Sequence, residues 1–332
     1  MGQLTALAGV TALLLSTSVI AANYTLADSY DSTNFFDEFS FFADSDPTHG
    51  FVRYLDAEAA EAASLASCKD DVVFLAVDNT TLHPPGGRPS VRVTSNKAYN
   101  TGLFIADISH MPGNACGVWP AFWTFGPDWP NGGEMDIIEG VSMQSSTAVT
   151  LHTSAGCTIT NNGSASGTTL SSGDCNSNSG FDGCSQQTSD TASFGDGFNA
   201  VEGGVYAMEW TTGAISVWFF PRGSIPADII GGIPDPTSWT TPHARFVASG
   251  CDFTSHFKDQ NIVFDTTMCG DWAGNAWSSD TKCSALASTC EEYVAANPAA
   301  FSEAYWLVNS VKVYQQGASA KGNLRQARKF RE

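Results

Sequence analysis

The sequence predicts an all-β protein, on three observations. Short runs rich in β-branched and aromatic residues recur along the chain, separated by glycine, proline, asparagine and serine. Helical periodicity is confined to short pieces late in the chain. The 332 residues, 42% of them hydrophobic, can bury a sizeable core. Because we find no internal repeat and no change of composition before residue 317, a single large β-sandwich over residues 23–316 is the economical interpretation.

Each predicted strand is an apolar or alternating run bounded by turn residues. The segment 211–213, Thr-Thr-Gly, joins two of these runs as a hairpin. In the last predicted strand Val311 and Val313 share one face, and Lys312 and Tyr314 share the other. The predicted strands are residues 72–77, 91–94, 102–108, 205–210, 214–220 and 306–314.

Two other segments break the pattern of strands. Residues 289–296 predict a short helix that stops at Asn297-Pro298, where Asn297 can cap a second short turn. Residues 154–200 are rich in serine, glycine, asparagine and threonine and contain three cysteines. We expect a long surface excursion pinned by disulfides.

The amino-terminal residues and the cysteines indicate secretion. Residues 3–22 carry no charge, and the apolar run 13–20 is too short for a membrane span, so residues 1–22 are predicted to be a signal peptide. Nine cysteines without C-x-x-C spacing predict disulfides, with Cys68 as the odd free thiol. Sequons at Asn23, Asn79 and Asn162 agree with an extracellular protein.

The charge narrows the range of partners. A net charge of −19 and a pI near 4.4 argue against nucleic acid and anionic membranes, and favour a neutral substrate. Five of the fifteen basic residues lie in the tail 317–332, which we interpret as solvated and disordered rather than as an anchor for a structural wall protein. We predict a monomer without cofactor or metal.

The segment 117–140, GVWPAFWTFGPDWPNGGEMDIIEG, is the most informative in the chain. Glu134, Asp136 and Glu139 interrupt an apolar strand, where carboxylates are unfavourable unless they are paired, neutralised or functional. In a regular strand Glu134 and Asp136 share a face and Glu139 points the other way. A β-bulge at Ile137 or Ile138 would turn Glu139 to the same face as the other two acids.

Carboxylates on one face of a strand fit the hydrolysis of a glycosidic bond. One carboxyl attacks the sugar or activates water while the other protonates the leaving oxygen, and a spacing of about 5 to 5.5 Å goes with retention of configuration. Judged from the residues alone, a polar strand face or a calcium site remains an equal alternative.

The same residues resemble the catalytic signature of glycoside hydrolase family 16, in particular the fungal endo-1,3(4)-β-glucanases or laminarinases. The resemblance implies a β-jelly roll of two curved antiparallel sheets with a concave substrate cleft. It also implies that Glu134 is the nucleophile, Glu139 the acid/base and Asp136 an assisting residue. Further matching segments are GRPSVRV at 87–93, TLHTSAGC at 150–157, FFPRGSIP at 219–226 and FDTTMCGDWAG at 264–274.

Six more residues are candidates for substrate binding, each with a purely structural alternative. Indole rings can stack on the C–H faces of sugars but are also common in cores. For His152 the alternative is a buried core histidine, for Arg92 a solvated strand face, and for Trp272 packing beneath a disulfide. The candidates are Trp119, Trp123, Trp129, Arg92, His152 and Trp272.

The sequence therefore predicts a secreted endo-acting β-glucanase. The chain has no H-E-x-x-H, no G-x-S-x-G and no phosphate loop, which argues against other common hydrolase and nucleotide chemistries. Two alternatives remain on the same fold: a β-glucan transglycosylase that uses the same residues, and a non-catalytic β-glucan-binding protein.

Overall fold

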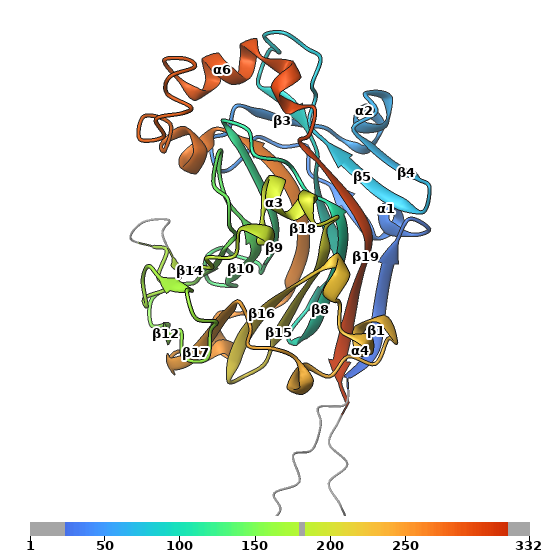
Figure 1. The fold of residues 1–332 in the computed structure, drawn as a ribbon, viewed down its shortest axis with the longest axis vertical. Helices are drawn as coiled ribbons and strands as arrows, with labels where there is room; N and C mark the ends of the chain where they lie inside the picture. Colours follow the sequence, from blue (N-terminus) through green and yellow to red (C-terminus); the bar gives the residue numbers. More distant parts are fainter. Residues whose placement is uncertain (1–23, 179–182, 318–332) are drawn as a thin grey trace, which may run out of the picture.

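The computed structural model describes residues 24–178 and 183–317. Within them the chain forms two large antiparallel sheets stacked face to face, with a few short helices at the edges (Figure 1). The predicted all-β class and the curved two-sheet arrangement are confirmed. The predicted signal peptide 1–22, the sequon at Asn23 and the tail beyond Gly317 lie outside the described residues.

The first sheet has nine strands, and the long strand β19 organises it by pairing with β8, β5 and β1. Because Tyr24 pairs with Gln316, the two ends of the described chain lie side by side. In order across the sheet the strands are β12 (Thr158–Thr160), β17 (Ala244–Gly250), β16 (Ala214–Pro221), β15 (Gly204–Trp210), β8 (Gly102–His110), β19 (Tyr305–Gln316), β5 (Val72–Ala76) and β4 (Ala66–Lys69), with β1 (Tyr24–Asp31) beside β19.

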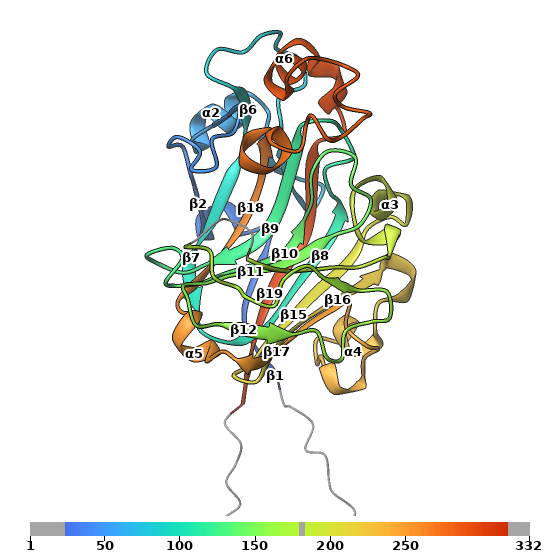
Figure 2. The ribbon, with the colours of Figure 1, turned by 90° about the vertical axis from the view of Figure 1, so that its left-hand side faces the viewer.

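The second sheet has eight strands, and Figure 2 faces its outer surface, opposite the core, which we call the open face. In order across this sheet the strands are β13 (Thr169–Leu170), β14 (Cys184–Gln187), β11 (Ala148–His152), β10 (Glu134–Glu139), β9 (Val118–Phe125), β18 (Gln260–Met268), β7 (Arg92–Tyr99) and β2 (Phe39–Phe41). A small parallel pair, β3 (Val52–Tyr54) and β6 (Arg88–Ser90), lies beyond this sheet.

Short helices decorate the sandwich. The α-helices are α1 (Phe35–Glu38), α2 (Ala57–Ala62), α3 (Gly195–Ala200), α4 (Ala227–Ile230), α5 (Phe253–His256) and α6 (Cys290–Ala296). Single turns are η1 (Thr191–Ser193), η2 (Arg222–Ser224), η3 (Pro236–Ser238), η4 (Gly270–Gly274) and η5 (Pro298–Phe301). None of the described helices is long and apolar enough to span a bilayer.

The main hydrophobic core fills the space between the two sheets. Phe122 and Phe264 stack with ring centroids 4.5 Å apart, and Trp306 packs edge-on against Phe264. Fully burying each such ring contributes about 1.5–3 kcal/mol. The core side chains of β9, β10 and β18 therefore fix these strands, and the residues that alternate with them face outward.

The strand predictions hold to within a few residues. Residues 72–77, 102–108, 205–210, 214–220 and 306–314 correspond to β5, β8, β15, β16 and β19, and residues 91–94 are the start of the longer β7. Val311 and Val313 lie in the core as predicted. Tyr314 on the opposite face is also buried, because Ile225, Ile229 and Trp239 belong to a separate apolar cluster that covers this part of the sheet.

The predicted helix and excursion need smaller corrections. Helix α6 begins after Thr289, whose hydroxyl accepts from the Glu292 N–H at 3.2 Å. Asn297 precedes η5 but does not cap it through its side chain, which donates to the Tyr293 carbonyl instead. The segment 154–200 is pinned by disulfides as expected, yet it also contributes β12, β13 and β14 to the two sheets.

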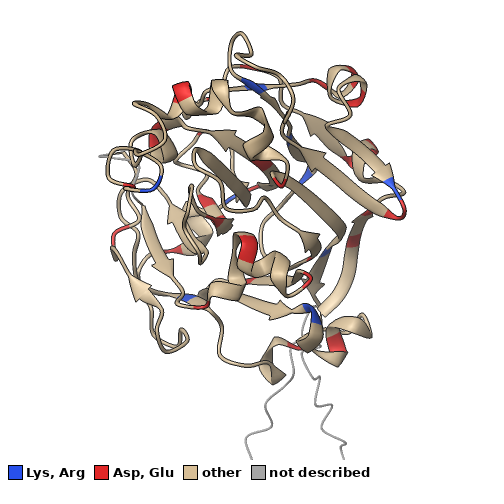
Figure 3. Ribbon diagram, turned by 45° about the horizontal axis from the view of Figure 1, so that its top comes forward, with Lys and Arg blue, Asp and Glu red and all other residues tan. Residues whose placement is uncertain are grey.

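Four disulfides and one free cysteine account for all nine cysteines, and the exposed Cys68 is the free thiol as predicted. The bridges are Cys116–Cys283, Cys157–Cys251, Cys175–Cys184 and Cys269–Cys290. Acidic residues are scattered over the described chain and outnumber the basic ones, in keeping with the net charge of −19 (Figure 3).

Candidate active site

The three acids of β10 all lie on the open face of the eight-stranded sheet, because the strand contains a bulge. Pairing between β10 and β9 shifts register between Asp136 and Ile138. As a result Ile137 and Ile138 are both buried in the core, although they are consecutive in the chain. The bulge that the sequence predicted is present, and it returns Glu139 to the side of Glu134 and Asp136.

The turn between β9 and β10 places Glu134 at the start of its strand. Gly126 donates its N–H to the Gly133 carbonyl and closes the turn. Gly133 has φ +76°, and a Cβ there would lie 2.4 Å from the His256 carbonyl oxygen. Glycine is therefore required at this position both by backbone conformation and by space.

Glu134 accepts a hydrogen bond from the Trp129 indole N–H, with 2.5 Å between Nε1 and Oε2. Burial raises the pKa of Glu134 from 4.5 to about 8, and the charge of Asp136 adds to the shift. His152 and the Trp129 N–H oppose it, since both favour the ionised carboxylate.

Asp136 is 2% exposed, and His152 Nε2 lies 3.3 Å from its Oδ2. The other ring nitrogen of His152 is 2.9 Å from the Ser177 hydroxyl, which fixes the ring between the two groups. Burial raises the pKa of Asp136 and the charge of Asp265 raises it further, while hydrogen bonding with Glu134 lowers it. His152 thus lies beside the acids, as the resemblance implied.

Glu139 lies at the other end of the strand and has its own indole donor. Trp119 Nε1 donates to Oε1 at 2.9 Å, and the backbone N–H of Glu139 donates to the Thr147 hydroxyl at 3.1 Å. Burial raises the pKa of Glu139 well above 4.5, and the negative charge of Asp136 raises it further. Glu139 is therefore biased toward its protonated form.

A second polar group on the open face surrounds Arg92 on β7. The Arg92 guanidinium is 4.6 Å from the Phe42 ring centroid and 4.9 Å from that of Trp123. Arg92 is only 7% exposed, and its Nε has no hydrogen-bond partner among the described residues. The solvated-face alternative for Arg92 is therefore wrong, because the guanidinium packs between aromatic rings.

Asp265 on β18 is a further acid at this site, which sequence reasoning missed. Its carboxylate accepts from Trp123 Nε1 at 3.3 Å and from the Tyr54 hydroxyl at 3.2 Å. Burial raises the pKa of Asp265 to about 6, although the charge of Arg92 lowers it. The available signal was a carboxylate directly after the apolar run Ile-Val-Phe at 262–264, in the β-prone segment IVFDTTM; acids next to apolar strand residues also drew attention to β10.

Trp272 lies in η4, edge-on to Trp119 at 5.7 Å between ring centroids. The structure therefore brings the nine predicted site residues to one face of one sheet in two groups. One group surrounds the acids of β10 and comprises Glu134, Asp136, Glu139, His152, Trp119, Trp129 and Trp272. The other comprises Arg92 and Trp123, joined through Asp265.

One set of side chains in the described part of the chain could hold a metal ion. Glu134, Asp136 and His152 each offer an atom within 4.8 Å of the other two. Calcium prefers six to eight oxygen ligands, which this set of two carboxylates and an imidazole does not supply. The predicted absence of a metal remains a prediction.

Comparison with known proteins identifies the family. Residues 39–314 match the family model described as XgeA-like, catalytic GH16 domain. The chain belongs to glycoside hydrolase family 16. A solved family 16 structure, laminarinase 16A from Phanerochaete chrysosporium with β-glucans in its donor and acceptor sites, is 43% identical with a TM-score of 0.83, over 89% of this chain and 100% of that one.

Three further proteins are similar in sequence to this chain over most of its length. A probable endo-1,3(4)-beta-glucanase of Neosartorya fischeri is 48% identical over 84% of this chain, and the endo-1,3(4)-beta-glucanase of Arthroderma benhamiae is 44% identical over 84%. The chain spans 44% and 62% of the length of these two proteins. A structure described as an elongating family 16 beta-1,3-glucosyltransferase is 44% identical with a TM-score of 0.82, over 88% of this chain and all of that one.

Proposed function

We propose that this chain is an endo-acting retaining β-glucanase that hydrolyses β-1,3- and mixed β-1,3/1,4-glucans. The observation that carries the proposal is the bulge in β10. It turns Glu134 and Glu139 to the same open face, and each carboxyl has a separate indole donor. Two carboxyls held apart on one face are what a two-step displacement at a sugar carbon requires.

In the first step Glu134 attacks the anomeric carbon and the glycosidic C–O bond breaks. Glu139 gives its proton to the departing oxygen, which leaves as a hydroxyl, and a covalent glycosyl-enzyme remains. In the second step a water molecule loses a proton to Glu139 and attacks the same carbon, releasing Glu134 as a carboxylate. Two inversions retain the β-configuration.

The electrostatics of Glu139 support its role as the acid, while the Trp129 N–H and His152 favour the ionised form of Glu134 that the attack needs. Burial raises the pKa of all three carboxyls of β10, and the charge of Asp136 raises the pKa of both glutamates, so the three are not all ionised at neutral pH. Glu139, whose pKa is raised well above 4.5, is suited to hold a proton. Asp136 assists through its negative charge, which raises the pKa of Glu139 and so helps to keep the acid protonated.

The surrounding side chains fit a neutral sugar chain. Trp123, Trp129 and Trp272 offer partly exposed indole rings on which sugar faces can stack. The unpartnered Nε of Arg92 can donate to a sugar hydroxyl, and His152 can bond either substrate or Asp136. We assign these residues and Trp119 to substrate binding, and propose that the enzyme acts as a secreted extracellular monomer, in keeping with its four disulfides.

Product analysis tests the proposal. Laminarin and lichenan should give a ladder of oligosaccharides, and cellulose should be cut negligibly, because a site shaped for a β-1,3 kink fits a straight β-1,4 chain poorly. Proton NMR of the first products should show the β-anomer. If the α-anomer forms first, the retaining mechanism is wrong, and if cellulose is cut as fast as laminarin, the specificity is wrong.

Transglycosylation is the second candidate, favoured by the 44% identical glucosyltransferase structure. The same glycosyl-enzyme would pass its sugar to a glucan hydroxyl instead of water. Incubation with laminari-oligosaccharides should then yield products longer than the starting chains. A non-catalytic glucan-binding protein is the third, and would show no release of reducing sugar in any of these assays.

A further inference from the structure

Two indole N–H groups point at the two glutamates, one at each. Trp129, in the turn before β10, donates to Glu134, and Trp119, near the start of β9, donates to Glu139. The resemblance gave Trp119 only a sugar-stacking role. A hydrogen bond to the carboxyl is a different role, because it acts on the protein group that would transfer the proton.

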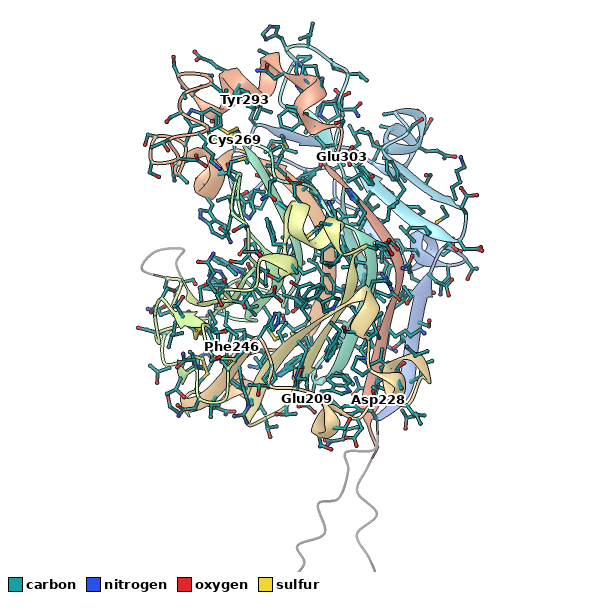
Figure 4. All side chains as sticks on the ribbon, in the orientation of Figure 1. Glu209, Asp228, Phe246, Cys269, Tyr293 and Glu303 are labelled. Carbon is teal, nitrogen blue, oxygen red and sulfur yellow. A yellow bond between two sulfur atoms is a disulfide. The ribbon has the colours of Figure 1, made fainter. Side chains whose placement is uncertain are left out.

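Trp119 packs against a segment that is anchored by a disulfide bond. Its ring meets Trp272 at an interplanar angle of 87°, and Trp272 belongs to η4, directly after Cys269. Cys269 is bonded to Cys290 on α6. Figure 4 shows Cys269 at the same end of the molecule as Tyr293 of α6, away from the end at which β1 begins and β19 ends.

The backbone before Trp119 is fixed as well. Cys116 is bonded to Cys283, and a Cβ at Gly117 would lie 3.0 Å from the Cys290 sulfur and 2.7 Å from a Val294 methyl. Two disulfides therefore pack around the chain immediately before Trp119. The backbone that carries the Trp119 indole is thus held close to two cross-links.

We propose that Trp119 is a positioning residue for Glu139. The indole N–H of Trp119 donates to Oε1 of Glu139, and so leaves Oε2 of the same carboxyl to carry the transferred proton. This inference rests on the proposed function. In the first step Oε1 accepts from Trp119 while the proton on Oε2 passes to the leaving oxygen. The carboxylate that forms then gains a charge-assisted hydrogen bond, which favours the forward transfer.

The charged groups around Glu139 define the expected pH behaviour. Asp136 and Glu134 raise its pKa, and His152 and the Trp119 N–H lower it. Removing the N–H therefore raises the pKa of Glu139 further. Since the acid must be protonated, the alkaline limb of kcat/KM moves to higher pH, by about one unit for the loss of one charge-assisted bond.

The test uses matched variants of Trp119 in the full chain with laminarin as substrate. Trp119→Gln can place an amide N–H at the same number of bonds from Cα as the indole N–H, whereas Trp119→Met is similar in size but has no donor. We expect the alkaline limb to move up in Trp119→Met and in Trp119→Phe, which keeps an aromatic ring, and to stay near wild type in Trp119→Gln. Trp129→Phe is the matched control and should move the acidic limb instead.

Two results would overturn the inference. The first is an alkaline limb that stays in place in the methionine and phenylalanine variants. The second is an equal shift in Trp119→Gln and Trp119→Met, which would assign the effect to ring packing. Should the phenylalanine variant fail to fold, the glutamine and methionine pair still decides. The variant Glu139→Gln distinguishes a failure of the inference on Trp119 from a failure of the proposed function. Full activity of that variant on laminarin would refute Glu139 as the acid itself.

Discussion

Replacing Glu134 by glutamine should abolish turnover and at the same time stabilise the fold at neutral pH. The amide cannot attack the anomeric carbon, so no glycosyl-enzyme forms. Its oxygen can still accept from Trp129 Nε1, so the turn before β10 keeps its contact. A buried carboxyl whose pKa is raised costs stability whenever the unfolded chain would ionise it.

The sign and size of the effect follow from the pKa. Burial raises the pKa of Glu134 from 4.5 to about 8. Above pH 4.5 the unfolded chain releases a proton that the folded site retains, so the folded state loses stability as pH rises from 4.5 toward 8. Each pH unit corresponds to about 1.4 kcal/mol, which gives an upper value of about 3 kcal/mol at pH 7. Because Glu134 is partly exposed, water screening reduces this to roughly 1–2 kcal/mol.

The assay is chemical denaturation of wild type and Glu134→Gln at pH 4 and pH 7, together with hydrolysis of laminarin. We expect near-equal stability at pH 4 and a more stable variant at pH 7. Glu61→Gln, at an exposed position on α2, is the control and should show no such difference. Equal stabilities of Glu134→Gln and wild type at both pH values would refute the electrostatic argument, and near-native turnover would refute Glu134 as the nucleophile.

Three further predictions concern the same strand. Glu139→Gln should lose about 10²–10⁴-fold in kcat/KM on laminarin but far less on an aryl glucoside with a good leaving group, and equal losses on both substrates would count against Glu139 as the acid. Deleting Ile138 should remove the bulge and turn Glu139 away from the open face, with severe loss of laminarin hydrolysis and modest destabilisation; a fully active deletion variant would show that the bulge is incidental. Dialysis against EDTA should leave hydrolysis unchanged, and a loss restored by added metal would show that Glu134, Asp136 and His152 hold an ion.

Local pattern was sufficient to predict some of the strands and the bulge. The runs that became β5, β8, β15, β16 and β19 alternate or are continuously apolar, and their ends carry turn residues. The bulge followed from parity alone, since Glu134 and Glu139 are five residues apart and lie on one face only if a residue is added between them. The three strands within 154–200 were missed because they have only two to four residues each, and β12 and β14 pair with segments distant in the sequence.

Contacts between strands could not be predicted in the same way. Asp265 reaches Trp123 because β18 pairs with β9 in a register that places Asp265 opposite Ala121. Nothing in the local sequence of either strand encodes that register, which is set by the core residues on their other faces. A solvated face remained an alternative for Arg92 for the same reason, since the ring of Phe42 that covers it comes from a separate segment.

The two indole donors, Trp129 and Trp119, differ in whether the local sequence could predict their contact with a glutamate of β10. Trp129 reaches Glu134 across a turn of five residues, a contact within the range of local sequence reasoning. Trp119 reaches Glu139 from the neighbouring strand, and its orientation depends on a loop fixed by Cys269–Cys290 and Cys116–Cys283. These two bridges lie outside the turn that joins Trp129 to Glu134. If Glu139 is the acid, as proposed, partial reduction of the two bridges should impair proton transfer to poor leaving groups before it impairs attack by Glu134. Hydrolysis of laminarin should therefore fall before hydrolysis of an activated aryl glucoside. If both activities fall in parallel, the loop held by these disulfides does not act through Glu139.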